Sequence, residues 1–217
     1  MLSDSVVVAI QDEMAHIYYV DLQTGKILDQ FDFGKNADFE GVAAHNQYFY
    51  VLRSDGTIFK VSQTSVTEQF KFKHNKHFDF EGMCLDESKN RLLVACKEHG
   101  DKDKRDHIFI YSFLLDSGTY DKKPSFKIKL EKVHKNFKPS GIAIHPNGNI
   151  YVISSFSKTL LVLSPNGDIL NHEQLNEYII HQPEGITFNS NGDLYVSNER
   201  TETSANILKF NNTQRSK

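Results

Sequence analysis

Short runs of alternating apolar and polar residues follow one another along the chain, with polar turns between them. An alternation with a period of two predicts β-strands, and no segment shows the period of an amphipathic helix. Asn-Gly pairs at residues 147–148 and 191–192 supply the positive φ angles that tight hairpin turns require. The predicted strands are residues 6–10, 16–21, 27–31, 38–43, 48–52, 57–61, 68–72, 79–84, 91–96, 107–111, 125–130, 138–143, 149–153, 159–163, 169–173, 182–187, 193–197 and 206–210.

One short phrase recurs four times and predicts the architecture. In each copy a glutamate or a serine stands directly before a glycine, and apolar residues follow. The glycines are Gly41, Gly82, Gly141 and Gly185, at intervals of 41, 59 and 44 residues. A repeat of about 40 to 50 residues that holds four short strands is typical of the blades of a β-propeller.

These repeats predict an all-β chain that folds as a single five-bladed propeller, in preference to six blades. We expect the blades at roughly residues 1–33, 34–74, 75–133, 134–177 and 178–217. The first blade enters the pattern at its second strand and the last ends at its third, so both are incomplete. Because an open ring leaves bare strand edges, we expect a further N-terminal piece of about 20–30 residues, enough for two strands and a turn.

Composition and charge narrow the class of protein. The 217 residues are 39% hydrophobic and 24% charged, which suffices for one sizeable core. A net charge of −3, with acidic and basic residues interleaved, gives no field that attracts nucleic acid. No apolar run is long enough to span a membrane. Cys84 and Cys96 are too few for a disulfide framework, and we expect them to be small apolar residues in neighbouring strands.

The residue before each glycine is the first candidate for chemistry. It is Glu40, Glu81 and Glu184 in three repeats and Ser140 in the fourth. Side chains alternate across a strand, so these residues point toward the central channel if their strand is the innermost of its blade.

A second acidic set follows at the end of the next strand. Its members Asp55, Glu98 and Glu199 lie 15, 17 and 15 residues after the preceding glutamate, and Glu13 holds the matching place in the first blade. Two acidic rings around one axis repel each other unless a positive charge lies between them. We therefore expect a metal site that draws on Glu40, Glu81, Glu184, Glu199, Glu98, Asp55 and Glu13.

Calcium is the metal that suits these residues. It takes six to eight oxygen ligands in flexible geometry, whereas zinc prefers imidazole or thiolate, and the ten histidines form no zinc-binding cluster. The alternative is that each glutamate accepts backbone N–H bonds from the adjacent blade and locks the ring without a metal.

Catalytic groups are harder to find. A histidine of the set His45, His77, His145 and His181 could act as a general base in the channel, although an exposed or hydrogen-bonded histidine is the simpler interpretation. No nucleophile elbow and no ordered Ser/His/Asp arrangement is present, so the sequence gives no support to nucleophilic catalysis.

The repeated phrases and the strand ends together resemble the SdiA-regulated family of bacterial proteins, and NHL-repeat proteins share parts of them. The resemblance implies a five-bladed propeller with a calcium site, carried behind a signal or anchor in the periplasm or cell envelope. It points to Glu40, Glu81, Glu184 and Glu199 as ligands, whereas Ser140 departs from the pattern. The residues concerned are Asp38-Phe39-Glu40-Gly41-Val42-Ala43, Asp79-Phe80-Glu81-Gly82, Gln182-Pro183-Glu184-Gly185-Ile186, Ile10-Gln11-Asp12-Glu13 and Val196-Ser197-Asn198-Glu199.

The functional hypothesis is a calcium-binding propeller of the cell envelope that binds a small molecule or an envelope protein, as a monomer. The rival hypothesis is a calcium-dependent hydrolase of the lactonase or esterase kind, in which a channel metal polarises a carbonyl or activates water. An open metal position with a base beside it would separate the two.

Overall fold

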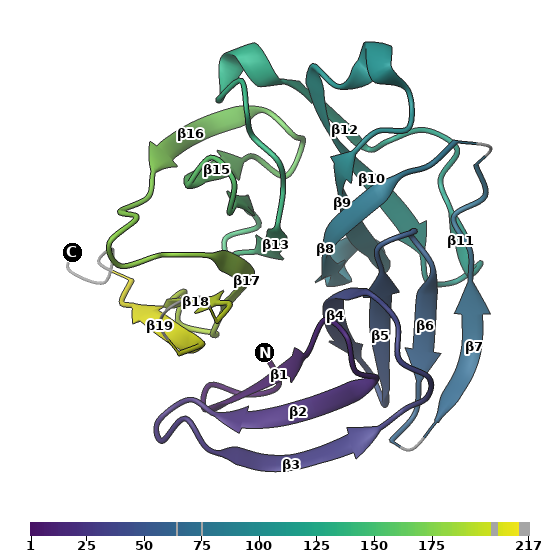
Figure 1. The fold of residues 1–217 in the computed structure, drawn as a ribbon, viewed down its shortest axis with the longest axis vertical. Coiled ribbons are helices and arrows are strands. Elements are labelled where there is room, and N and C mark those ends of the chain that lie inside the picture. The colour runs from purple at the N-terminus through teal and green to yellow at the C-terminus, as the bar shows by residue number, and fades with distance from the viewer. Residues whose placement is uncertain (64, 75, 201–203, 213–217) are drawn as a thin grey trace.

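The strands assemble into five antiparallel sheets that surround a central axis (Figure 1). This computed structural model describes residues 1–63, 65–74, 76–200 and 204–212. The five-bladed β-propeller predicted from the repeats is confirmed. Within these residues, helix is confined to three short 3₁₀ turns, η1 (Glu87–Lys89), η2 (Lys102–Lys104) and η3 (Leu130–Lys132).

Each blade is one sheet, with its strands in chain order. Blade 1 holds β1 (Val6–Ile10), β2 (His16–Asp21) and β3 (Ile27–Asp32). Blade 2 holds β4 (Phe39–His45), β5 (Tyr48–Arg53), β6 (Ile58–Val61) and β7 (Val66–Phe70). Blade 3 holds β8 (Asp79–Asp86), β9 (Arg91–Glu98), β10 (His107–Leu114), β11 (Thr119–Tyr120) and β12 (Phe126–Lys129). Blade 4 holds β13 (Gly141–Ile144), β14 (Ile150–Ser154), β15 (Thr159–Leu163) and β16 (Ile169–Gln174), and blade 5 holds β17 (Pro183–Phe188), β18 (Leu194–Asn198) and β19 (Asn206–Phe210).

The glycine phrases form the innermost strands. β4, β8, β13 and β17 each begin a sheet, and they contact one another in sequence around the axis. The sequence did not anticipate β11, which pairs with β10 beside β12.

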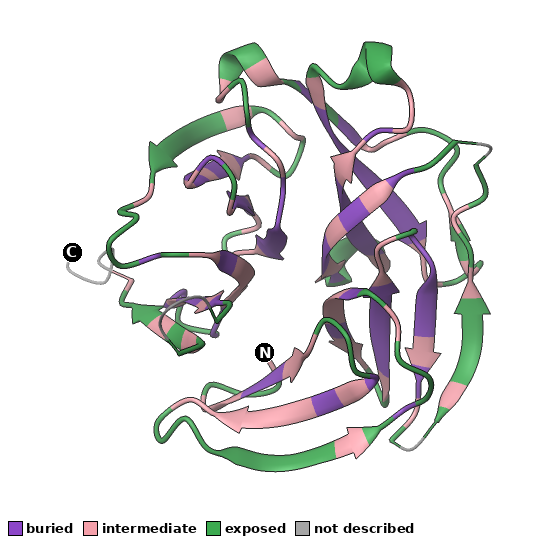
Figure 2. Ribbon diagram, in the orientation of Figure 1, coloured by how far each residue is buried: buried purple, intermediate pink, exposed green. Residues whose placement is uncertain are grey.

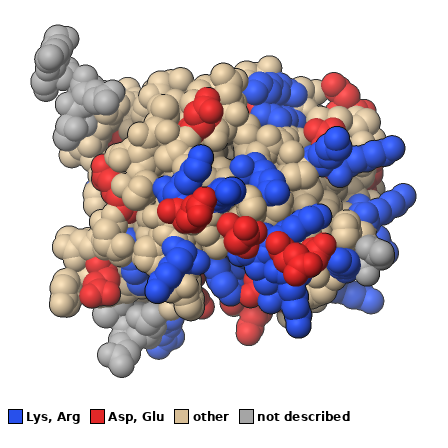
Figure 3. Space-filling view, turned by 90° about the horizontal axis from the view of Figure 1, so that it is seen from above, with Lys and Arg blue, Asp and Glu red and all other residues tan. Residues whose placement is uncertain are grey.

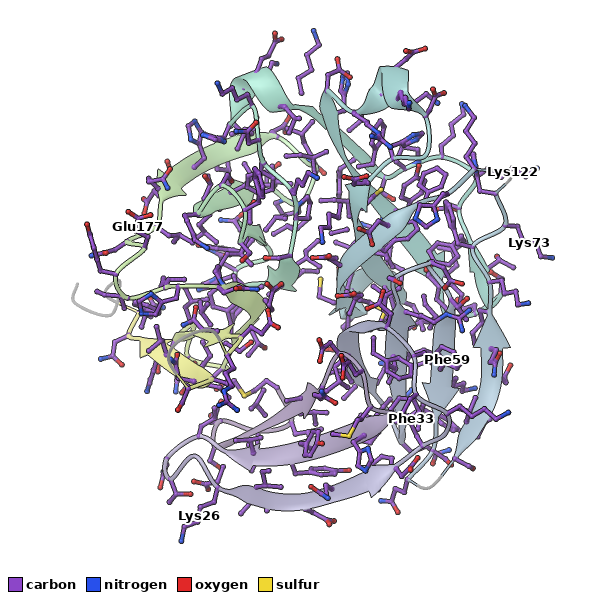
Figure 4. The ribbon with its side chains drawn as sticks, in the orientation of Figure 1. Lys26, Phe33, Phe59, Lys73, Lys122 and Glu177 are labelled. Carbon is purple, nitrogen blue, oxygen red and sulfur yellow. The ribbon has the colours of Figure 1, made fainter. Side chains whose placement is uncertain are left out.

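Apolar side chains fill the spaces between neighbouring blades. Four buried clusters lie between blades 1 and 2, 2 and 3, 3 and 4, and 4 and 5. Figure 2 shows the buried segments on the inner and middle strands and the exposed ones on outer strands such as β3, β7 and β16. In Figure 4 the labelled Phe33 and Phe59 point between blades 1 and 2, whereas Lys26, Lys73 and Glu177 point outward at the rim.

The hairpin turns differ from the expected Asn-Gly geometry in one respect. Gly148 has φ 89° and Gly192 has φ 80°, but neither preceding asparagine has a positive φ. The Gly148 N–H donates to His145 O at 2.8 Å, so three residues of the turn keep ordinary φ angles and the glycine alone supplies the left-handed one.

Blades 1 and 5 each contain three strands in the part of the chain that is described. They meet where the Ser190 N–H and hydroxyl donate to the Asp4 carboxylate, at 3.0 and 2.9 Å. None of the described helices is long and apolar enough to cross a membrane. On the edge of the molecule seen in Figure 3, basic and acidic side chains are interleaved.

The glycines of the inner strands allow the blades to approach closely. A Cβ atom on Gly82 would lie 3.0 Å from Gly141 Cα, and one on Gly141 would lie 2.7 Å from Glu184 O. Both distances are to backbone atoms, which cannot rotate away. Contact with the next blade therefore favours glycine in the first three phrases, whereas a Cβ on Gly185 would meet the Ser197 side chain of its own blade.

We predict that Gly141→Ala lowers the free energy of unfolding by about 1–3 kcal/mol, the usual cost of overpacking. Gly34→Ala is the control, because a Cβ there would lie 3.9 Å from its nearest neighbour, the Val66 side chain. Urea unfolding of the two variants measures the difference. Equal stability would show that the inner strands can separate without cost.

Candidate metal and ligand site in the central channel

The glutamates of the glycine phrases lie on β-bulges. Phe39 pairs with Arg53 and Gly41 with Leu52, so Glu40 is an extra residue with no partner of its own. The pairing shifts in the same way at Glu81 and at Glu184. A bulge twists the strand and re-aims a side chain. Figure 4 shows oxygen-tipped side chains extending from β4 and β17 toward the space that the sheets enclose.

Ser140 holds the equivalent place in blade 4. Its N–H donates to Ile153 O at 2.8 Å, the residue with which Gly141 pairs. Its hydroxyl donates to Pro183 O at 2.6 Å and accepts from the Ser155 N–H at 3.0 Å. Ser140 therefore ties blade 4 to blade 5 without a charge.

Two of the bulged glutamates have strongly raised pKa values. Burial, the nearby Asp38 and Asp79 carboxylates and a hydrogen bond with Asp38 raise the pKa of Glu40 to about 8. Burial and the Glu199 carboxylate raise the pKa of Glu184 to about 7, against the opposing effect of a hydrogen bond with Ser155. Negative charge is thus crowded at the axis and only partly neutralised.

Lys97 is the positive charge within this crowd. Its ammonium contacts the Glu81 carboxylate and lies 3.9 Å from Asp79 Oδ2. Its charge also lowers the pKa of Glu40 and of Glu184, which belong to other blades. One lysine from β9 therefore acts on acids from blades 2, 3 and 5.

Strand register shows which residues share the position of Lys97. In blades 2 to 5 each phrase glycine pairs with a residue of the second strand, and the residue two places after that partner holds the position of Lys97. The pairs are Gly41–Leu52, Gly82–Ala95, Gly141–Ile153 and Gly185–Ser197. The equivalent residues are Ser54, Lys97, Ser155 and Glu199.

The second acidic set is therefore not a single ring. Asp55 and Glu98 lie one position further on than Glu199, although the sequence spacings are similar. Asp55 binds Arg53 at 2.7 Å, and hydrogen bonds from Arg53 and Thr57 outweigh its burial and lower its pKa to about 2.

Glu98 and Glu13 are not on the bulges. Lys138 donates to Glu98 at 2.7 Å and thereby lowers the pKa of Glu98. Glu13 is exposed in the loop between β1 and β2. Of the seven predicted ligands, Lys97 acts on Glu40, Glu81, Glu98 and Glu184, whereas Glu199 is exposed, accepts from Gln182 and acts on Glu184.

The donor chemistry fits calcium, since the acids at the axis offer only oxygen atoms. Within the described residues, however, no three His, Cys, Asp or Glu side chains are grouped closely enough to hold a metal ion. The Lys97 ammonium lies against Glu81 and near Asp79, where a cation would be attracted. A metal would have to compete with this lysine.

A cavity of about 430 Å³ opens beside the channel acids. Its lining comes from the starts of the inner strands β8 and β17, the end of β9, the segment before β13 and the loop between β14 and β15. The lining residues are Glu81, Lys97, Lys138, Pro139, Ser140, Ser155, Phe156, Lys158, Gln182 and Glu184.

The candidate histidines do not gather at this cavity. His45 ends β4, five residues along an extended strand from Glu40, and His145 lies in the turn after β13. At about 3.3 Å per residue this places them toward the opposite end of the inner strands. His77 and His181 precede β8 and β17 and are the two on the cavity side.

Lys97 and Phe156 were missed as site residues. Lys97 could have been found by aligning the repeats on strand partners, where it replaces serine or glutamate. The number of residues between the glutamate and the second acid does not reveal this alignment, because the hairpin turns between the first two strands differ in length.

Comparison with known proteins places the chain in a family. A family model described as SdiA-regulated matches residues 2–202. A search of the curated proteins finds no match.

Solved structures share the fold at low sequence identity. A protein of unknown function from Bacteroides caccae has a TM-score of 0.59 at 15% identity, covering 97% of this chain and 70% of that one. The WD40 propeller domain of Doa1 has a TM-score of 0.56 at 15% identity, with 96% and 64% covered. A streptogramin B lyase has a TM-score of 0.55 at 12% identity, with 98% and 67% covered. At these identities the likeness is one of fold alone.

The raised pKa values predict that stability falls as pH rises. An unfolded glutamate titrates near 4.5, so the folded state retains a proton on Glu40 up to pH of about 8. The contribution of Glu40 is complete below pH 4.5 and is lost as pH rises through 8.

Glu40→Gln should therefore unfold at a higher temperature than the parent at pH 9, and at a similar one at pH 4.5, in EDTA. Partial exposure screens the charge, so we expect a gain of about 2–4 °C, the size of a 1 kcal/mol effect. Glu177→Gln, at the exposed rim, is the control. A Glu40→Gln gain that does not depend on pH would contradict the assignment.

Proposed function

The chain belongs to the SdiA-regulated family, and from this premise we propose that it is a calcium-binding β-propeller whose channel mouth binds a small ligand. The observation that carries the proposal is the convergence of bulged glutamates from blades 2, 3 and 5 on one lysine. Bulges place side chains at functional sites more often than regular strand positions do.

Crowded carboxylates favour a divalent cation. Burial and neighbouring carboxylates raise the pKa of Glu40 to about 8 and that of Glu184 to about 7, and the positive charge of Lys97 offsets these shifts only in part. A bound Ca²⁺ would supply that charge and would lower both pKa values, so binding would release protons. Oxygen ligands on separate strands suit an ion that tolerates irregular geometry.

Lys97 would limit the affinity of this site for calcium. Its ammonium neutralises part of the charge that attracts calcium, so calcium and the lysine compete for Glu81 and Asp79. We propose a modest affinity for calcium as the result.

The hydrolase hypothesis stays a prediction, as do the cell-envelope location and the monomeric state. His77 and His181 are the histidines on the side of the cavity, and a hydrolase would require a base there. No contact of either histidine with the channel glutamates favours it over a binding module.

We predict that millimolar CaCl₂ raises the melting temperature of EDTA-treated protein, because a ligand that binds only the folded state stabilises it. The rise should be about 2–4 °C for each 1 kcal/mol of binding energy. MgCl₂ is the control, since Mg²⁺ demands a stricter octahedral site. An equal rise with both ions would point to general screening of charge, and no rise would favour glutamates that act as struts alone.

Charge-neutral variants locate the site. Glu81→Gln and Glu184→Gln should each weaken calcium binding about tenfold or more, measured by isothermal titration calorimetry, whereas Lys97→Met should strengthen it. Glu131→Gln, far from the axis on η3, should leave it unchanged. Unchanged binding in both glutamate variants would remove calcium from the channel.

A further inference from the structure

We propose that the cavity beside the channel binds a small molecule that carries a flat apolar ring and an anionic group. The ring would stack on Phe156 and the anion would meet Lys158. This inference names a ligand class for the module proposed above and therefore rests on that proposal. It concerns the wall of the cavity that blade 4 supplies.

Phe156 is the apolar surface of this wall. It belongs to the short loop between β14 and β15, and it is 68% exposed although it lines a cavity. Single exposed apolar residues are common on protein surfaces. A phenyl ring this exposed in the wall of a concave site offers a surface for stacking, which is a common way in which aromatic side chains bind flat ligands.

Lys138 and Lys158 line the cavity together with Phe156. The Lys138 ammonium lies 5.7 Å from the centroid of Phe156 and donates to Glu98 Oε1 at 2.7 Å, so its charge is already shared. Lys158 forms no ion pair with any described residue. It is the lysine in this wall that is available to an anion.

The backbone holds Lys158 in an unusual conformation. Its φ is 50°, in the left-handed region that few residues other than glycine occupy. The Leu175 N–H donates to Lys158 O at 2.6 Å and fixes the turn in place. Strained backbone of this kind gathers at functional sites more often than elsewhere. The turn presents Phe156 and Lys158 together at the cavity.

The acids in the lining would orient the ligand. Glu81 and Glu184 also line the cavity, and an anionic group beside them would be repelled. The anionic group must therefore lie toward Lys158, with the ring between it and the channel. Ser155 and Gln182 add polar side chains along the rim.

Phenyl phosphate is a probe with both parts, and inorganic phosphate and phenol carry one part each. Isothermal titration calorimetry, in EDTA and again in CaCl₂, should give phenyl phosphate a Kd on the order of 1 mM, as expected for so few atoms. Phosphate and phenol should each bind at least about tenfold more weakly. Equal binding of inorganic phosphate would overturn the role of the ring.

Two variants test the residues. Phe156→Ala should weaken phenyl phosphate binding about fivefold, the value of one aromatic pair. Lys158→Asn should do the same, and asparagine tolerates the positive φ. Tyr178→Ala removes an 84% exposed aromatic outside the cavity, and Lys129→Gln removes a lysine of a second cavity, so both should leave the Kd unchanged.

The outcomes separate this inference from the calcium proposal. Weaker binding of phenyl phosphate by Phe156→Ala and by Lys158→Asn in EDTA supports the ligand class even if calcium fails to bind. Binding of calcium without binding of phenyl phosphate overturns the ligand class and leaves the metal site standing. An unchanged Kd in both variants, with melting temperatures like that of the parent, overturns the inference.

Discussion

The inner strands of neighbouring blades contact each other through their backbones, and the rest of the channel depends on that contact. Gly82 and Gly141 lie so close to the inner strand of the next blade that a single methyl group would collide with main-chain atoms. The inner strands can therefore carry no side chain at this position. Charged groups from neighbouring blades are then forced together one residue away, on the bulges of Glu40, Glu81 and Glu184.

Lys97 neutralises the three bulged glutamates to different extents. Lys97 satisfies Glu81 most directly and acts on Glu40 and Glu184 only through space. Burial and neighbouring carboxylates raise the pKa of both of these glutamates in spite of the lysine. A lysine that can be displaced and acids that can be deprotonated are what a site needs if it is to exchange an internal cation for an external one.

The fold could be predicted from sequence because each blade repeats the same local rules. Alternation of apolar residues gave the strands, and the recurring glycine gave the innermost strand of blades 2 to 5. The site was harder, since residue counting assumes a constant register. Asp55 and Glu199 each follow a bulged glutamate by the same number of residues, yet a difference in the hairpins pairs Asp55 with Arg53 and Glu199 with Gln182, near Glu184. A one-residue shift in register turns a side chain to the other face.

Blade 4 explains why the cavity lies where it does. Its two axial positions hold Ser140 and Ser155, where blade 3 holds Glu81 and Lys97. Serines are shorter and carry no charge, so this part of the channel has neither the volume of a glutamate–lysine pair nor its ion pair. The Ser140 hydroxyl donates to Pro183 O and accepts from the Ser155 N–H, so these hydrogen bonds hold the cavity wall in place while the short side chain leaves the cavity open. The serines that break the acidic repeat in blade 4 therefore also leave room for the cavity beside the channel.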